Sequence, residues 1–216
     1  MPRTEGADGY CVAVTENGYN YWGYTTIPKP YIECCPAELR SLSQDQLVMS
    51  AAFHEAGHAV AALRGGIPVV PVEIIVPRPC ERCGAPKAGG GNQGLMLNVG
   101  TADDTLRMLA AGVEAEMLWA EDQGSVTDRE RWAIELSGID DQGIAREVAD
   151  SCRASGWPQM DYGPPGPDPR PWNWPHQRQR ARTAVRLWWP QVEAVASRLA
   201  HRRHLTPADI TAALSP

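Results

Sequence analysis

The sequence predicts a mainly helical α+β fold in which a small β-sheet lies beside one long, buried helix. Residues 44–63 (QDQLVMSAAFHEAGHAVAAL) are dense in Ala, Leu and Val and stop before a pair of glycines, which indicates a largely buried helix. Residues 69–77 (VVPVEIIVP) are β-branched and short, as strands are. Several segments after residue 100 carry apolar side chains at helical spacing.

The chain divides into four predicted parts. Residues 1–43 are rich in Gly, Tyr and Asn and predict an irregular arm or short strands. Residues 44–156 form the predicted core, with an inserted loop at 77–93 that contains the sequence CERCG. The proline-rich residues 157–177 predict an extended, exposed connection. We expect residues 178–216 to be helical and packed on the core.

Within the core, the strand at 69–77 is followed by a glycine-rich gap and a second predicted strand at 94–99 (GLMLNV). A second buried helix is predicted over 101–120, since Thr101 is a suitable N-cap and acidic residues follow it in the first turn.

Shorter helices follow. Residues 127–136 begin with a capping-box pair, Thr127 and Glu130, and Gly138 closes this segment. Another helix starts close to Asp141 and continues to residue 153. Helical patterns also cover the final segments, residues 180–200 and 207–214.

Composition and charge narrow the class of protein. The 216 residues suit one domain, or one domain with appendages. The 26 acidic and 20 basic residues give a net charge of −6, which argues against a nucleic-acid binder. The first thirty residues lack a signal-peptide pattern, and no stretch approaches the ~20 apolar residues of a membrane span. We therefore expect a cytoplasmic protein that binds neither nucleic acid nor membrane.

The motif HEAGH at residues 54–58 lies inside the first predicted helix. Side chains four positions apart on a helix point within about 40° of each other, so His54 and His58 can reach one metal ion. Glu55 projects beside that ion, where a general base belongs. The alternative is a coincidental pentapeptide with two satisfied core histidines. A buried, Ala-rich helix has no structural need for His, Glu and His on one side, which favours the metal site.

Zinc suits such a site, because imidazole is a good ligand for it and a catalytic zinc keeps three protein ligands and one water. Zinc lowers the pKa of that water from ~15.7 to about 7. Glu55 would take the proton of the attacking water and pass it to the leaving amine. This reasoning predicts hydrolysis of a peptide or other amide bond.

The segment AAFHEAGHAVAAL resembles the peptidase domain of the FtsH-like, ATP-dependent membrane proteases, and the likeness extends over about residues 44–155. That family has a β segment after the metal helix, then a helix with a Gly-x-x-Ala-Glu pattern, then a ligand Asp at the start of the next helix. Here VEIIVP, Gly112 to Glu116 and SGIDD occupy those places. The resemblance implies a zincin-like metallopeptidase domain, a catalytic zinc ion and a peptide or protein substrate.

The resemblance also implies a third ligand, Asp141, since the family's ligand Asp follows a small residue and a glycine and has alanines four and eight residues after it. Asp128 is the main alternative, and the neighbouring Asp140 is a further one. The resemblance places Glu116 in the position of an acidic residue that accepts a hydrogen bond from a ligand imidazole. A surface acid on the helix is the other interpretation of Glu116.

The chain departs from the family in two respects. It has no Gly-x-x-x-x-Gly-Lys-Ser/Thr phosphate loop, so we expect no ATPase module in it, and we expect no membrane anchor. Short peptides, exposed tails or a small-molecule amide are then more accessible substrates than folded proteins. A separate ATPase partner and a homo-oligomer are both left open.

Cysteines predict a second, structural zinc site. Cys80 and Cys83 form a CxxC turn followed by a glycine, a zinc-knuckle pattern that supplies two thiolates. Cys34 and Cys35 complete four sulfurs if the arm packs on this loop, with Cys11 or a histidine as a substitute for one of them. Free thiols in a mobile loop are the alternative.

The sequence as a whole predicts a zinc metallopeptidase with Glu55 as general base. Two alternatives stay open: a non-catalytic, zinc-stabilised interaction protein, and a zinc-dependent amide-processing enzyme of a biosynthetic pathway.

Overall fold

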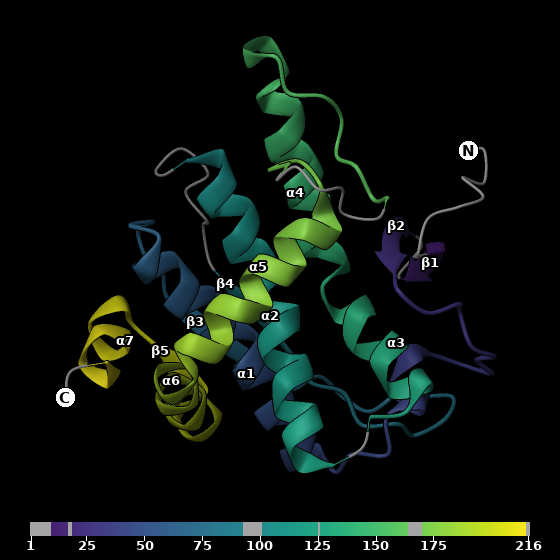
Figure 1. Cartoon of the computed structure of the whole chain (residues 1–216). Helices are drawn as coiled ribbons and strands as arrows, with labels where there is room; N and C mark the ends of the chain where they lie inside the picture. Colours follow the sequence, from purple (N-terminus) through teal and green to yellow (C-terminus); the bar gives the residue numbers. More distant parts are fainter. Residues whose placement is uncertain (1–9, 17–18, 93–100, 125, 164–169, 215–216) are drawn as a thin grey trace.

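A computed structural model describes residues 10–16, 19–92, 101–124, 126–163 and 170–214 (Figure 1). These residues form a mainly helical α+β structure, which confirms the predicted class. The strands are β1 (Tyr10–Glu16), β2 (Tyr19–Thr25), β3 (Val72–Ile75), β4 (Gly89–Asn92) and β5 (His204–Leu205). The helices are α1 (Gln44–Arg64), α2 (Ala102–Gln123), α3 (Asp128–Ser137), α4 (Ile139–Ser151), α5 (Trp174–Leu187), α6 (Trp189–Arg202) and α7 (Pro207–Ala213), with 3₁₀ turns η1 (Pro36–Leu39) and η2 (Arg153–Ser155).

Helix α1 is the central element. It begins with a capping box in which Ser43 and Gln46 exchange hydrogen bonds, and it ends at Gly65, close to the predicted limits. From Ser50 to Ala62 every residue is buried, because α1 packs against α2, α6, β3 and β4. Since polar groups on a buried helix need partners inside the protein, the polar residues of α1 must be paired there.

Helices α1 and α2 approach each other closely because small residues lie between them. A Cβ atom on Gly57 would lie 2.4 Å from the carbonyl oxygen of Ala111 and 2.8 Å from the Cβ of Ala115. Real Cβ atoms do not come so near to such atoms, so glycine is required at position 57 for this packing. The close approach brings α2 beside the polar face of α1.

The three-stranded antiparallel sheet has the order β4-β3-β5. β3 confirms the strand predicted within residues 69–77, whereas β4 lies in the glycine-rich stretch that we expected to be loop. The ladder with β3 holds β4 in an extended conformation despite the low strand preference of glycine. The predicted strand at 94–99 lies outside the described residues.

Part of the N-terminal arm is a β-hairpin, so the short-strand form of the prediction is the one observed. Gln142 of α4 ties β2 to the core: its side chain accepts a hydrogen bond from the backbone nitrogen of Tyr24 at 2.7 Å and donates one to the backbone oxygen of Tyr24 at 2.9 Å. The carboxylate of Glu135 in α3 accepts two more from Thr26. The hairpin and α7 lie on opposite sides of the molecule (Figure 1).

The prediction of an exposed connection over 157–177 is wrong at its end. Helix α5 begins at Trp174, whose side chain is 1% exposed, and Asn173 caps it through the backbone nitrogen of His176 at 2.8 Å. Pro175 fits in the first turn, because the backbone nitrogens there need no partner within the helix. Residues 164–169 lie outside the described part.

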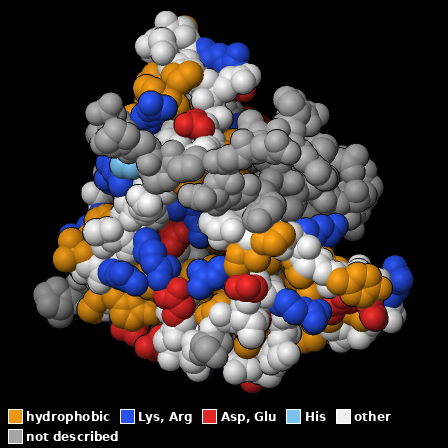
Figure 2. All heavy atoms as spheres, turned by 45° about the vertical axis from the view of Figure 1, so that its right-hand side comes forward, with side chains coloured by type: hydrophobic (Ala, Val, Ile, Leu, Met, Phe, Trp, Pro, Cys, Tyr) orange, Lys and Arg blue, Asp and Glu red, His pale blue; other side chains and the backbone are white. Residues whose placement is uncertain are grey.

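The helical pattern over 180–200 is divided between two helices, since Pro190 lies in the first turn of α6 and Trp188 separates α5 from α6. Helix α5 crosses α2, and α6 packs against α1 (Figure 1). Within the described residues, none of the helices combines the length and the apolar character that crossing a membrane needs. Figure 2 shows basic and acidic side chains interspersed on one face.

Candidate metal centres

The two histidines of α1 point to one place, and Asp141 reaches that place from the first turn of α4. The Nε2 atom of His54 lies 3.2 Å from Oδ2 of Asp141, and the Nε2 atom of His58 lies 3.3 Å from the same oxygen. The donor atoms of the three residues all lie within 4.8 Å of one another. This group can hold a metal ion.

These distances suit a single small cation. In a tetrahedral zinc site with bonds of about 2.0–2.1 Å, neighbouring ligand atoms are about 3.3 Å apart. The two imidazole–carboxylate distances, 3.2 and 3.3 Å, already have that value. Two neutral imidazoles and one carboxylate also match the donor set of catalytic zinc sites. The residues present therefore fit the metal that the sequence predicts.

The other nitrogen of each imidazole is occupied. Nδ1 of His54 lies 3.1 Å from Oε2 of Glu116, and Nδ1 of His58 lies 2.9 Å from the backbone oxygen of Met108. Both partners accept hydrogen bonds, so a ring that gives up one proton to bind a metal keeps the other on Nδ1 and offers the lone pair of Nε2 as a ligand. Helix α2 thus orients both rings.

Glu116 is the centre of a buried polar network. Its Oε1 accepts hydrogen bonds from Arg40 and from Ser50, both at 2.6 Å, and its Oε2 accepts one from Ser137 at 2.6 Å. Burial by itself raises the pKa of Glu116, but the charge of Arg40 and the hydrogen bond from His54 lower that pKa to about 2. The geometry matches the role that the resemblance implies for Glu116.

Asp141 is also held as a carboxylate. Burial opposes its ionisation, but the neighbouring His58 and His54 hold the pKa of Asp141 well below its usual range. The two other acids considered from the sequence do not belong to this group. Asp128 and Asp140 are both exposed and neither belongs to the group, so the structure brings Asp141 alone of the three to the histidines.

Glu55 lies beside the histidines and is only 5% exposed. Its side chain packs directly on the backbone of β4: a Cβ atom on Gly90 would lie 2.3 Å from Cγ of Glu55. Burial raises the pKa of Glu55, while the charges of His58 and His54 oppose that rise. Glu55 is thus a carboxylate in a site shielded from solvent.

The sequence identified Gly112 only as the first residue of the Gly-x-x-Ala-Glu pattern, and the structure shows what it does. A Cβ atom there would lie 2.3 Å from Nε2 of His58 and 2.8 Å from Nε2 of His54. Position 112 of α2 must therefore be glycine for both donor atoms to stand where they do. Arg40 and Ser50 were missed altogether, because nothing in their spacing links them to the motif, and Ser137 was noted only as the small residue before Gly138, not as a partner of Glu116.

The second group consists of the four predicted cysteines, Cys34, Cys35, Cys80 and Cys83. Sγ of Cys34 lies 3.5 Å from Sγ of Cys80, and Sγ of Cys35 lies 3.8 Å from Sγ of Cys83. Four thiolates around zinc, with bonds of about 2.3 Å, are about 3.8 Å apart. Both adjacent cysteines take part, so the group needs no substitute ligand. The side chain of Cys11 lies outside the described part.

The turn at Cys80 has the shape of a zinc knuckle. The backbone nitrogen of Gly84 donates to the oxygen of Cys80 at 2.8 Å, and Gly84 has a positive φ of 71°. The backbone N–H groups of Cys83 and Arg82 donate to the sulfur of Cys80 and lower its pKa to about 6. The hydrogen bond with Cys80 raises the pKa of Cys34 to about 12. The turn thus stabilises a negative sulfur at position 80.

Comparison of the chain with models of protein families and with curated proteins gave no match. The two groups of metal-binding side chains are therefore the basis on which a function can be assigned.

Proposed function

We propose that this protein is a zinc-dependent hydrolase of peptide or other amide bonds, related in mechanism to the peptidase domain of the FtsH-like proteases. One observation carries the proposal: the Nε2 atoms of His54 and His58 lie 3.2 and 3.3 Å from one Asp141 oxygen. Two imidazoles and one carboxylate favour zinc and leave one coordination position for solvent or substrate.

The chemistry divides between the metal and the protein. Zinc, when bound, polarises the scissile carbonyl and lowers the pKa of water to about 7. Glu55 accepts the proton of the attacking water and donates it to the leaving amine. The low exposure of Glu55 supports this role, because a shielded carboxylate with a raised pKa is a better proton carrier near neutrality. Glu116 and the backbone oxygen of Met108 hold the two rings in position.

The exposure of the three ligands suggests how a substrate enters. The side chain of Asp141 is 16% exposed, against 11% for His54 and 4% for His58. We infer that the scissile bond approaches past Asp141, since β4 covers the Glu55 side. The low exposure of all three ligand side chains favours a short peptide, an exposed tail or a small amide over a folded protein.

The substitution Glu55→Gln tests the mechanism. It keeps the size of the side chain and removes its basicity, so zinc should remain bound while hydrolysis falls by about 10²–10⁴-fold. Zinc content is measured by elemental analysis, and hydrolysis is measured on a library of short fluorogenic peptides. Full activity in the variant would remove Glu55 from the mechanism.

A matched pair tests the ligand set. Asp141→Asn should lose zinc from this site and lose activity, whereas Asp128→Asn should keep both, since Asp128 is exposed and does not belong to the group. The reverse result would assign the third ligand to Asp128. Zinc found on the cysteines alone, with His54 and His58 dispensable for binding, would favour the non-catalytic interaction protein.

The four-cysteine group is proposed to bind zinc as well. Four thiolates with tetrahedral spacing are typical of closed, structural zinc sites. A closed site of this kind has no position for a substrate, so its role is structural.

A further inference from the structure

We propose that the four cysteines hold a zinc ion that fastens the N-terminal arm to the loop between β3 and β4, and so holds both segments against the His54–His58–Asp141 group. The arm segment is residues 33–43, and the knuckle loop is residues 76–88. The proposal concerns how two segments are held together. It therefore does not depend on whether the protein hydrolyses amides.

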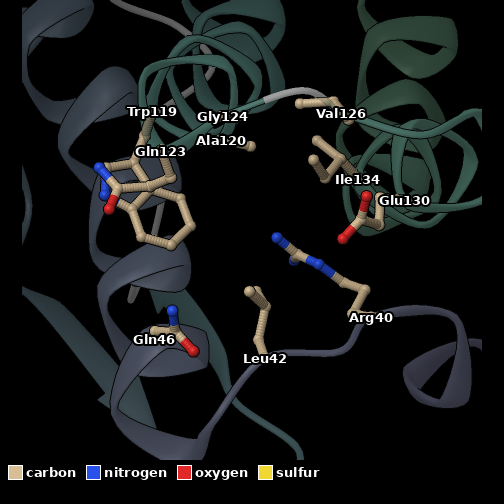
Figure 3. Close-up of a pocket in the computed structure, with 10 residues that line it drawn as sticks. All are labelled: Arg40, Leu42, Gln46, Trp119, Ala120, Gln123, Gly124, Val126, Glu130 and Ile134. Carbon is tan, nitrogen blue, oxygen red and sulfur yellow. The ribbon is translucent and has the colours of Figure 1, made fainter.

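On the arm side, the cysteines lie just before a residue that reaches the first group. Cys34 and Cys35 come directly before η1, and the backbone nitrogen of Cys34 donates to the side chain of Glu38 at 2.9 Å. Arg40 follows η1 and donates to Glu116 and to Ser50. Figure 3 shows Arg40 pointing from the arm into a cavity between α2 and α3. An ion that holds Cys34 and Cys35 in place therefore also holds the short segment from which the Arg40 side chain extends.

On the loop side, the cysteines lie shortly before the strand that covers Glu55. The chain leaves Cys83 and passes Lys87, whose backbone oxygen accepts a hydrogen bond from Gln44 at 2.8 Å. It then forms β4, where Gly90 packs on Glu55. The position of β4 is thus set by the knuckle loop on one side and by its pairing with β3 on the other.

Little else holds the first part of the knuckle loop, residues 76–84, whereas Ala88 at its end packs on the core. Residues 76–79 and 81–84 are exposed, so the loop buries almost no apolar surface there. A segment without a core is ordered by a disulfide or a metal ion, and the free energy of metal binding then becomes free energy of folding. The four sulfurs of the arm and this loop come together at one point, so an ion bound there would connect the two segments.

Backbone N–H groups of both segments point at the sulfur atoms. Those of Cys83 and Arg82 donate to Sγ of Cys80, and that of Ala37 donates to Sγ of Cys35.

The test uses the full-length chain and its cobalt-substituted form, because thiolate-to-cobalt absorption in the near ultraviolet reports the cysteine site independently of activity. Wild type should bind two ions per chain, one for each group. Cys80→Ser should bind one and lose the absorption. Cys152→Ser is the control, since Cys152 lies outside the group, and it should match wild type. His54→Ala should keep the absorption.

Hydrogen exchange then tests the tie itself. In Cys80→Ser the amides of the knuckle loop and β4 should exchange about tenfold faster or more, while those of α6 stay unchanged. If this variant does not fold, wild type treated with a mercurial, which displaces zinc from thiolates, gives the same comparison. The proposal is overturned if wild type shows no thiolate-to-cobalt absorption. It is also overturned if zinc leaves the cysteines without faster exchange in β4.

Discussion

The two candidate metal groups are built in opposite ways. The donors of the first stand on helices α1 and α4, and α2 supports them from behind. The donors of the second stand on the arm segment and the knuckle loop, and Cys83 is exposed. In the first group, packing fixes the donors before any ion binds. In the second, we propose that the ion fixes the segments that carry the donors.

This difference determines how much of the folded structure would depend on each ion. A preorganised site loses little structure when its ion leaves, because the helices around it have their own core. A site on loops loses the order of those loops. Substitutions that disturb the helices should therefore affect metal affinity and stability at the first group, and should leave the cysteine group intact.

The largest effect is expected from Gly112→Ala. The added Cβ atom would lie 2.3 Å from Nε2 of His58, so at least one imidazole must turn away. We expect zinc affinity at the first group to fall by about 100-fold or more, since loss of ligand orientation alone costs 10–100-fold. The affinity is measured by competition with a coloured chelator.

Gly143→Ala is the matched control for this substitution. Within the part of the chain that the structure describes, and apart from the helix backbone around it, the nearest atom to a Cβ there is Nη2 of Arg146, at 3.9 Å. Alanine at this helical position should leave zinc affinity unchanged and stabilise the fold by about 0.4–1 kcal/mol. Unchanged affinity in both variants would contradict the close approach of α2 to the histidines.

A smaller effect is expected from Glu116→Gln. The amide still accepts a hydrogen bond from His54 but leaves Arg40 without its buried counter-charge. Zinc affinity should fall by about tenfold, and the free energy of unfolding should fall by about 3 kcal/mol. Chemical denaturation of the zinc-free proteins separates the second effect from the first. Equal stability of variant and wild type would show that the Arg40 pair contributes nothing to the fold.

The smallest effect is expected from an ion pair of the helical scaffold. Burial raises the pKa of Asp103, but Arg180 and Gln177 outweigh burial and lower it. A lowered pKa stabilises the folded state fully above the ordinary value near pH 3.8, and this contribution is lost as pH falls through the lowered value. The pair is partly exposed, so it contributes no more than about 1 kcal/mol.

Denaturation curves of wild type and Asp103→Asn check this pH dependence. Wild type should be the more stable at pH 7, and the difference should narrow as the pH is lowered below 4. A difference that does not change with pH would mean that the carboxylate charge has no part in it. The cobalt absorption of the cysteine group should be the same in both proteins.

The elements that the sequence predicts well are those with local signals. Helix α1 has an Ala-rich run and a glycine stop, and α3 has the capping box of Thr127 and Glu130 that the structure contains. The spacing of His54 and His58 places both rings on one face without further information. Such features depend on a few neighbouring residues, so they can be predicted from the sequence.

The features that could not be predicted from the sequence depend on contacts between residues that are far apart along the chain. The glycines of β4 have a low strand preference, and only pairing with β3 makes them a strand. Arg40 reaches Glu116 across seventy-six positions, and the Met108 partner of His58 is a backbone oxygen that any residue supplies. The start of α5 was missed because a proline-rich segment usually excludes a helix, whereas the first turn of α5 accepts a proline.

Anomalous diffraction at the zinc absorption edge, from crystals of the purified protein, shows whether His54, His58 and Asp141 bind one zinc ion. We expect an anomalous peak about 2.0–2.2 Å from both Nε2 atoms and from a carboxylate oxygen of Asp141. If crystals that contain zinc lack that peak and the two imidazole rings are turned apart, these residues do not form a zinc site.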